Sequence, residues 1–315
     1  MTSRLFRFDV DRVHFGNDGL GATTIGAAAD TLFSALCIQA LRVGGVGLLD
    51  ALVLAADTST LRLSDLHPYV GRTYLVPKPI ARVESGAVDA AAASTAKKAA
   101  KRLAFVPVDA LGDFLAGRAD LGALAEMQAS SGAFGLASRA AIFNGEADAA
   151  PYAVEFFAFA PNAGLWLLAT GTDEEIDLVT DLLSGLTAIG GERTSGYGSF
   201  TLTSDAVPGG LRPTTAGARL LALTTALPAD SELDVALEGA TYRLVRRSGF
   251  VASQSYADTP LRKRDLHKLA AGSVFTRPFN GVVADVSNCG AHPVWSYAKP
   301  LFLPLPDTAV AGVAA

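Results

Sequence analysis

The N-terminal segment of the chain alternates between apolar and polar side chains. Phe6, Phe8 and Val10 fall on one face, whereas Arg7 and Asp9 fall on the other. Successive side chains of a β-strand point to opposite faces. The pattern therefore predicts a strand over residues 5–10 with its apolar face against a core.

After a glycine-containing loop, the apolar residues recur with the period of a helix. Acidic residues favour a helix N-terminus and glycine favours its end, so the helix is predicted to begin near Asp30 and to end at Gly44-Gly45. Its apolar face buries one side of the helix against the predicted sheet. The residues on this face are Phe33, Leu36, Cys37, Ala40 and Leu41.

The same two periods return between residues 152 and 203. Residues 152–159 and 165–169 read as two strands of a hairpin with its turn at 161–164. A capping-box pattern from Thr172 to Glu175 starts a helix, and residues 199–203 form the next strand. The order β-α-β…β-α-β is typical of a ferredoxin-like (RRM-like) α+β fold. A large insertion, about residues 46–150, separates the first helix from the predicted hairpin.

A second, smaller α+β domain is predicted beyond a linker rich in proline and glycine, Pro208 to Pro213. Strands are expected at 219–227, 241–253, 282–286 and 294–305, with a short helix at 231–238. We therefore divide the chain into an N-terminal domain, 1–206, and a C-terminal domain, 214–315.

The composition agrees with two domains that have substantial cores. The chain has 315 residues, of which 50% are hydrophobic, and its mean hydropathy is +0.31. No uninterrupted apolar run reaches the roughly 18 residues that span a bilayer, and the N-terminus lacks a signal-peptide pattern. We expect a cytoplasmic protein without a membrane span. No Cys or His cluster has metal-ligand spacing, so no metal or cofactor is expected.

The net charge of −5 conceals a strongly basic segment. Residues 242–277 contain eight Lys or Arg and two acids, which gives a local net charge of +6. A second basic cluster covers residues 97–102. Basic segments on an acidic protein indicate one defined anionic ligand, although a solvated helix or strand face would also account for them.

Residues 188–200 form a glycine-rich loop between the second predicted helix and the strand that follows. Glycine permits positive φ and close approach to a ligand, and successive amides in such a turn can bind an anion. The Arg193 guanidinium adds hydrogen-bond donors that suit a phosphate. Tyr197, Phe15 and Phe250 are candidates for stacking on bases. The inventory suits single-stranded RNA, but a purely structural connection between helix and strand has the same composition.

Together with segments elsewhere in the chain, this loop resembles the RAMP superfamily of CRISPR proteins. The resemblance is closest to the family of subunit four of the type III-A (Csm) effector complex. It runs nearly from end to end and is weakest over residues 80–150. The segments that carry it are 14–16, 30–35, 75–79, 190–200, 245–251, 272–275 and 292–294.

The resemblance implies two ferredoxin-like RAMP domains and a non-catalytic protein that binds the 5′ handle of the CRISPR RNA. The expected partners are a large palm-domain subunit on one side and a backbone RAMP subunit on the other. A thumb-type hairpin in the insertion would lie beside the target RNA. The predicted RNA-binding residues are His14, Phe15, Gly16, Lys78, Gly190, Gly191, Arg193, Thr194, Ser195, Gly196, Tyr197, Gly198, Arg246, Arg247, Ser248, Gly249 and Phe250.

Some RAMP proteins are metal-independent endoribonucleases that use a histidine as general acid or base, and His14 is the candidate here. His67 and His267 are predicted to lie on the surface, and His292 to make a structural hydrogen bond. RNA cleavage needs a second group to activate the 2′-hydroxyl, and the sequence places no such group. A pure protein–protein adaptor is a third alternative, which would leave the basic segment unexplained.

Overall fold

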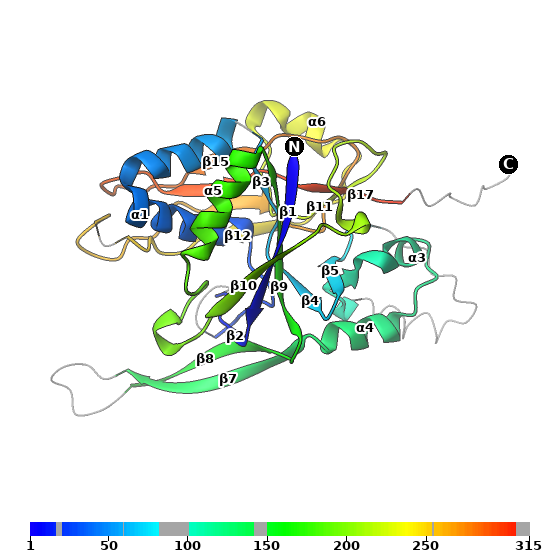
Figure 1. Cartoon of the computed structure of the whole chain (residues 1–315), viewed down its shortest axis with the longest axis horizontal. Coiled ribbons are helices and arrows are strands. Elements are labelled where there is room, and N and C mark those ends of the chain that lie inside the picture. The colour runs from blue at the N-terminus through cyan, green and yellow to red at the C-terminus, as the bar shows by residue number, and fades with distance from the viewer. Residues whose placement is uncertain (17–20, 59, 82–100, 142–149, 254, 307–315) are drawn as a thin grey trace.

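The structure is a computed structural model that describes residues 1–16, 21–58, 60–81, 101–141, 150–253 and 255–306. A seven-stranded antiparallel sheet forms its centre (Figure 1). The strand order is β10-β1-β9-β4-β5-β6, and β3 pairs with β9 beyond this path. The strands are β1 (Thr2–Val10), β3 (Arg62–Leu63), β4 (His67–Val70), β5 (Thr73–Pro77), β6 (Phe105–Pro107), β9 (Ala163–Gly171) and β10 (Phe200–Asp205).

The predicted N-terminal strand is confirmed as β1, at the centre of this sheet. Phe6, Phe8 and Val10 are buried in one hydrophobic core on the helix-covered face. Leu5 is also buried, in a second core on the opposite face. The sheet is therefore covered on both sides, although the sequence indicated only one apolar face.

Helices α1 (Ala29–Thr58) and α5 (Asp173–Ser184) contact each other and cover the first of these faces (Figure 1). The prediction that a helix ends at Gly44-Gly45 is partly right, because Gly45 has a φ of 67° and kinks α1, but helical structure continues to Thr58. α1 is long and apolar enough to cross a membrane by length and composition alone. Its first half is packed into the first core through residues such as Phe33.

The capping box of the second predicted helix is confirmed at the start of α5. The Thr172 hydroxyl accepts a hydrogen bond from the Glu175 amide, and the Glu175 carboxylate accepts one from the Thr172 amide. Ile176, Val179 and Leu183 are fully buried against the sheet. The helix thus starts where its own sequence satisfies the free amides of its first turn.

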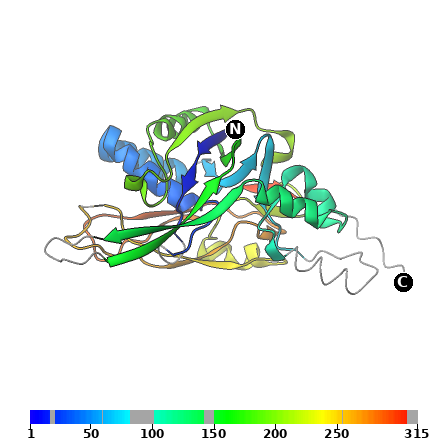
Figure 2. The same cartoon turned by 90° about the horizontal axis from the view of Figure 1, so that it is seen from below.

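The predicted hairpin of residues 152–169 is wrong in its pairing, although both strands exist. β8 (Ala150–Phe159) pairs with β7 (Gly132–Ala141) and with β2 (Arg12–Val13) in a separate three-stranded sheet. Both edges of β9 are already occupied, by β1 on one side and by β3 and β4 on the other, so β8 has no edge to join. The β7–β8 hairpin extends along the lower edge of the molecule in Figure 1 and crosses the foreground of Figure 2, which is seen from below.

Part of the segment that was predicted as an insertion belongs to the central sheet. The second half of α1 and strands β3, β4, β5 and β6 all fall within residues 46–150. Three short helices follow β6 and contribute to the second core. They are η1 (Val108–Ala110), α3 (Leu111–Leu115) and α4 (Leu121–Ala129).

The C-terminal third forms small antiparallel sheets behind the central sheet, connected to it by η3 (Gly209–Leu211). The predicted strands at 241–253 and 294–305 are broken, because only short stretches of each pair with a neighbour. The sheets are β14-β11-β17, β12-β13 and β15-β16. Their elements are β11 (Leu220–Ala222), η4 (Asp230–Glu232), α6 (Leu233–Leu237), β12 (Leu244–Arg247), β13 (Leu266–Leu269), β14 (Val274–Phe275), β15 (Val282–Asp285), β16 (Trp295–Ala298) and β17 (Phe302–Pro304).

Both large cores contain residues from both halves of the chain. Tyr297 packs against Phe33 in the first core, with ring centroids 5.3 Å apart. Leu221 and Leu303 lie in the second core beside Trp166. The halves are therefore joined by an extensive apolar contact, which we call the seam.

Candidate nucleic-acid interface

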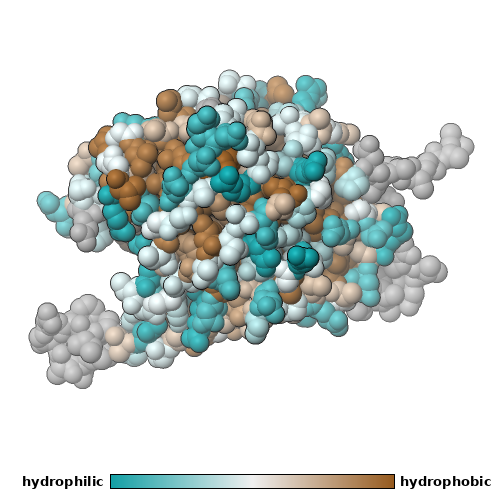
Figure 3. Space-filling model, in the orientation of Figure 1, coloured by the Kyte–Doolittle hydropathy of each residue, from teal (hydrophilic) through white to brown (hydrophobic). Residues whose placement is uncertain are grey.

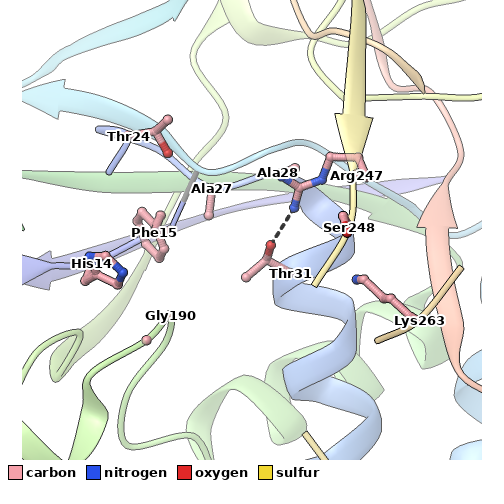
Figure 4. A pocket seen from close by; sticks show the side chains of 12 residues that line it. His14, Phe15, Thr24, Ala27, Ala28, Thr31, Gly190, Arg247, Ser248 and Lys263 are labelled. Atoms are coloured by element: carbon pink, nitrogen blue, oxygen red, sulfur yellow. Dashed lines mark hydrogen bonds between the residues drawn. The ribbon is translucent and has the colours of Figure 1, made fainter. Parts of the chain in front are cut away.

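A cleft of about 190 Å³ lies at the seam (Figure 4). Seven of the predicted RNA-binding residues line it, from three separate parts of the sequence. We call it the seam cleft. Its walls are His14, Phe15, Gly16, Thr24, Ala27, Ala28, Thr31, Gly190 and Gly191 from the N-terminal half, and Arg247, Ser248 and Lys263 from the C-terminal half.

The glycines of the 188–200 loop allow close packing against the chain itself. A Cβ at Gly198 would lie 1.8 Å from the Ile189 carbonyl oxygen, and one at Gly190 would lie 2.7 Å from the His14 carbonyl oxygen. Gly196, with a φ of 84°, has open space around it. Gly190 and Gly198 are therefore required because a side chain would collide with the protein itself. At Gly196, glycine is favoured only by the positive φ.

The prediction that the loop amides form an anion-binding nest is wrong for six of them, because backbone carbonyls already accept their hydrogen bonds. Gly191 N–H donates to the His14 carbonyl at 2.9 Å, and Gly198 N–H donates to the Arg12 carbonyl at 2.7 Å. The amides of residues 189, 195, 196 and 197 donate to carbonyls within the loop. What the loop offers a ligand is the exposed side chains of its short helix η2 (Arg193–Ser195), whose middle residue is Thr194.

Of the three stacking candidates, only Phe250 is accessible, with 63% of its surface exposed. Tyr197 is 5% exposed and packs against Phe156, with ring centroids 5.6 Å apart. Phe15 is also 5% exposed and belongs to the first core. The stacking role predicted for these two rings is therefore wrong, because their faces are covered by protein. The Arg262 guanidinium lies 5.4 Å from the Phe250 ring centroid.

His14 is buried at the edge of the seam cleft. Its Nδ1 lies 2.7 Å from the Glu155 carbonyl oxygen on β8, so it donates a hydrogen bond there. His14 is the only histidine that lines the cleft. This geometry gives His14 a structural role in joining the loop to the hairpin, and it provides no second histidine for acid–base cleavage.

The other histidines differ in their environments. His67 is buried instead of exposed; burial lowers its pKa to about 4, and its Nε2 lies 2.8 Å from the Leu223 carbonyl oxygen. His267 is exposed, as predicted. The predicted structural hydrogen bond of His292 is confirmed by its contact with Ser253 Oγ at 2.8 Å.

A buried ion cluster stands behind the C-terminal wall of the seam cleft. The Asp30 carboxylate accepts hydrogen bonds from Arg247 Nη2 at 2.6 Å, Arg247 Nε at 3.0 Å and Lys268 Nζ at 2.9 Å. Burial by itself would raise the pKa of Asp30, but the charges of Lys268 and Arg247 outweigh it and hold that pKa far below its usual range. Asp30 thus binds the C-terminal half from inside α1, instead of capping that helix.

The N-terminus of α1 is capped from a distance by Asp65. Its Oδ1 accepts hydrogen bonds from the amides of Ala29 at 2.8 Å and Thr225 at 3.0 Å, and its Oδ2 accepts one from Thr225 Oγ1 at 2.7 Å. Burial nevertheless raises the pKa of Asp65 to about 6, and the nearby charge of Asp30 acts in the same direction. This carboxylate also joins the two halves.

The remaining predicted residues are spread around the molecule. Arg246 is exposed and donates to Asp265 at 2.8 Å, so part of its charge is neutralised. Ser248 accepts a hydrogen bond from Arg262, and Gly249 adopts a φ of 131°. Lys78 does not line the seam cleft. Burial lowers the pKa of Lys78, and the charge of Arg243 adds to this effect.

Lys263 is the functional candidate that the sequence prediction missed. It lies within the basic segment 242–277 and lines the seam cleft opposite Gly190 (Figure 4). The segment's composition indicated an anionic ligand but could not distinguish Lys263 from the other basic residues. Only its position beside the cleft separates it from them.

Comparisons with known proteins show the family to which the chain belongs. Residues 215–305 match the model of the CRISPR Csm4 C-terminal domain. The chain is 58% identical over 309 residues to the CRISPR system Cms protein Csm4 of Mycobacterium tuberculosis (strain CDC 1551 / Oshkosh), covering 98% of this chain and 100% of that protein.

This chain belongs to the Csm4 family. It is thus a RAMP-type protein of type III CRISPR systems, in agreement with the resemblance drawn from its motifs. Its fold is also that of solved Csm4 structures. A chain in the crystal structure of a Csm3-Csm4 subcomplex of the type III-A CRISPR-Cas interference complex matches with a TM-score of 0.65 at 17% identity, covering 96% of this chain and 99% of that one.

A second solved structure shows the same fold. The crystal structure of a Csm1-Csm4 cassette in complex with cA4 contains a chain that matches with a TM-score of 0.57 at 17% identity. The match covers 97% of this chain and 100% of that chain. The two structures are of Csm4 relatives bound to two different proteins, Csm3 and Csm1.

Proposed function

We propose that this Csm4-family protein is a non-catalytic subunit that binds the 5′ handle of a CRISPR RNA at the seam cleft. The observation that carries the proposal is the cleft itself, where the glycine-rich loop faces Arg247 and Lys263 across the seam. Cations and hydroxyls around a narrow cleft suit a sugar–phosphate backbone. Arg193 and Phe250 are exposed and follow the lining residues Gly191 and Ser248 closely in sequence, so we include them in this surface.

The first half of the chain supports a ferredoxin-like RAMP domain, because β1, α1, β4, β9, α5 and β10 follow one another as β-α-β-β-α-β. The C-terminal half, with its small sheets, would then be a second, reduced RAMP domain. We assign the β7–β8 hairpin as the thumb that lies beside the target RNA. Residues 142–149 at its tip are outside the described part of the chain.

The protein would link a large palm-domain subunit to the backbone RAMP subunits. The solved complexes of Csm4 relatives with Csm1 and with Csm3 support this arrangement. Figure 3 shows apolar residues gathered over α1. Leu41, Val43, Val46 and Leu54 of that helix are exposed, and large exposed apolar patches mark protein–protein contacts. A partner subunit that covers this surface would keep the complex soluble in the cytoplasm.

Binding of a handle RNA tests the proposal directly. The full chain, co-purified with its large subunit, is titrated with single-stranded RNA of the handle sequence over a range of salt concentrations. Arg193→Ala is expected to weaken binding and to reduce the slope of log affinity against log salt by about 0.7, the contribution of one neutralised phosphate on a single strand.

Arg118→Ala is the matched control, because Arg118 is also exposed but pairs with Asp113 away from the seam cleft. The control variant should bind as the wild type does. Equal affinity for the handle RNA and for an unrelated RNA of the same length would contradict the proposal. So would crosslinking of the protein only to the 3′ end of a guide RNA.

A further inference from the structure

Among the described residues, the charges that act on one another at the C-terminal wall of the seam cleft do not balance. Arg247, Lys268 and Lys263 supply three positive charges, and the neighbouring Asp30 supplies one negative charge. Asp65, whose charge also acts on Arg247, adds at most one more. A net positive charge therefore remains in a partly desolvated place, where an unpaired cation is costly.

Lys263 carries most of this imbalance. Burial and the charge of Arg247 lower its pKa, whereas Asp30 opposes them. Within the described part of the chain, its ammonium group has no carboxylate within 4.0 Å and no side-chain hydrogen bond. Figure 4 shows the side chain extending along the cleft towards Thr31. An anion in the cleft would supply the missing partner.

Arg247 has donors left to contribute to the same anion. Its Nε and Nη2 are held by Asp30, and Nη2 also donates to Thr31 Oγ1 at 2.9 Å. Its Nη1 makes no hydrogen bond in the described structure. Lys268 is fully buried and is fixed in turn by Ser296 and by the Tyr297 carbonyl. Asp30 and Lys268 therefore hold Arg247 in place without reaching the cleft themselves.

The size of the cleft limits what the anion can be. Sites for whole small molecules usually measure about 300–1,000 Å³. The seam cleft measures about 190 Å³, which suits a phosphate group with part of its sugar better than a nucleotide with its base. The cleft itself therefore recognises RNA backbone, and discrimination between the handle and other RNAs falls to contacts outside it.

We propose that the seam cleft is a socket for a single phosphodiester group of the bound RNA, with Lys263 and Arg247 as its ligands and Asp30 and Lys268 as positioning residues. This inference rests on the proposed function and specifies where in the cleft one phosphate of the RNA binds. One wall of the socket comes from each half of the chain. The occupied phosphate thus connects the halves across the seam, and all other phosphates of the handle contact the surface more loosely.

A phosphate-by-phosphate scan tests the socket. The full chain with its large subunit is titrated with handle RNAs in which one phosphate at a time is replaced by a neutral methylphosphonate. In the wild type, replacement of one particular phosphate is expected to reduce the affinity about tenfold, because a charge-assisted contact is lost. Replacement of any other phosphate should reduce the affinity much less. Removing the base at that position, with the backbone intact, should leave the affinity unchanged.

In Lys263→Gln, a methylphosphonate at that position should reduce the affinity no more than one at the neighbouring positions does. In Lys263→Arg, the large loss of affinity at that position should return. Arg118→Gln is the control, since Arg118 is exposed, pairs with Asp113 and does not line the cleft. It should keep the wild-type pattern. Melting curves establish that each variant is folded.

The outcomes separate this proposal from the proposed function. The socket proposal is wrong, and handle binding stands, if the wild-type protein binds the handle RNA but loses the same affinity at every replaced phosphate. The same conclusion follows if one phosphate dominates and Lys263→Gln leaves that pattern unchanged. A wild-type protein without affinity for the handle RNA overturns both.

Discussion

Replacing Asp30 with asparagine removes the only carboxylate of the buried cluster with Arg247 and Lys268. Lys268 is 0% exposed and Asp30 is 1% exposed, so water cannot take the place of the lost charge. Three charge-assisted hydrogen bonds, of 2.6, 2.9 and 3.0 Å, are lost or weakened together. Removal of one partner from a buried ion pair costs about 3–5 kcal/mol, so Asp30→Asn should lower the free energy of unfolding by about that amount.

Urea denaturation followed by intrinsic fluorescence measures this difference at neutral pH. Asp177→Asn is the control: Asp177 is exposed and pairs with Arg4 at 3.4 Å, and such surface pairs contribute about 0–1 kcal/mol. The double variant Asp30→Asn/Lys268→Met, which removes the uncompensated ammonium as well, should recover part of the loss. A single variant within about 0.5 kcal/mol of the wild type would refute the reasoning.

Three further predictions follow from the same contacts. Gly198→Ala should lower the free energy of unfolding by more than about 3 kcal/mol, because its Cβ would lie 1.8 Å from a carbonyl oxygen. Gly196→Ala, with open space around it, should lower the free energy of unfolding by only about 1–2 kcal/mol. Thermal melts of the two variants measure the difference. Phe250→Ala should weaken RNA binding by about 1–3 kcal/mol if a base stacks there, and Tyr197→Ala should lower stability instead; RNA titrations and urea melts distinguish these effects. The Asp65 carboxyl has a pKa raised to about 6, so its contribution to stability is fully present below the unfolded-state pKa near 4 and is lost as the pH rises through 6. Asp65→Asn should remove that part of the pH dependence of urea midpoints, because the Asn Oδ1 can still accept from the two amides while its Nδ2 would donate to Thr225 Oγ1 instead of accepting from it.

Local patterns predicted the local elements well. The alternation around Phe6 and Phe8 identified β1, and the Thr172–Glu175 capping box identified the start of α5. Both signals come from residues close together in sequence, whose side chains define a face or satisfy nearby amides. The motifs around His14, the glycine loop and Arg247 likewise indicate the family, and they do so without their proximity in the fold.

Pairing and burial were decided by the tertiary structure. Strand β8 joins β7 because both edges of β9 are occupied by strands distant in sequence, and a local pattern contains no information about such competition. Tyr197 and Phe250 are equally plausible stacking residues in sequence, yet one is covered by Phe156 and the other is exposed.

By itself, the sequence of this protein predicted several of its elements, among them β1 and α5, the concentration of its basic residues, and its membership of the RAMP superfamily. Tertiary structure alone selected Lys263 from the basic residues between 242 and 277, and gave Asp30 two cationic partners more than 200 residues away. The physical reason is that the pKa of a charged side chain, and the energy of its interactions, depend on its burial away from water and on the charges beside it. Those are set by packing across the seam between the two halves of the chain.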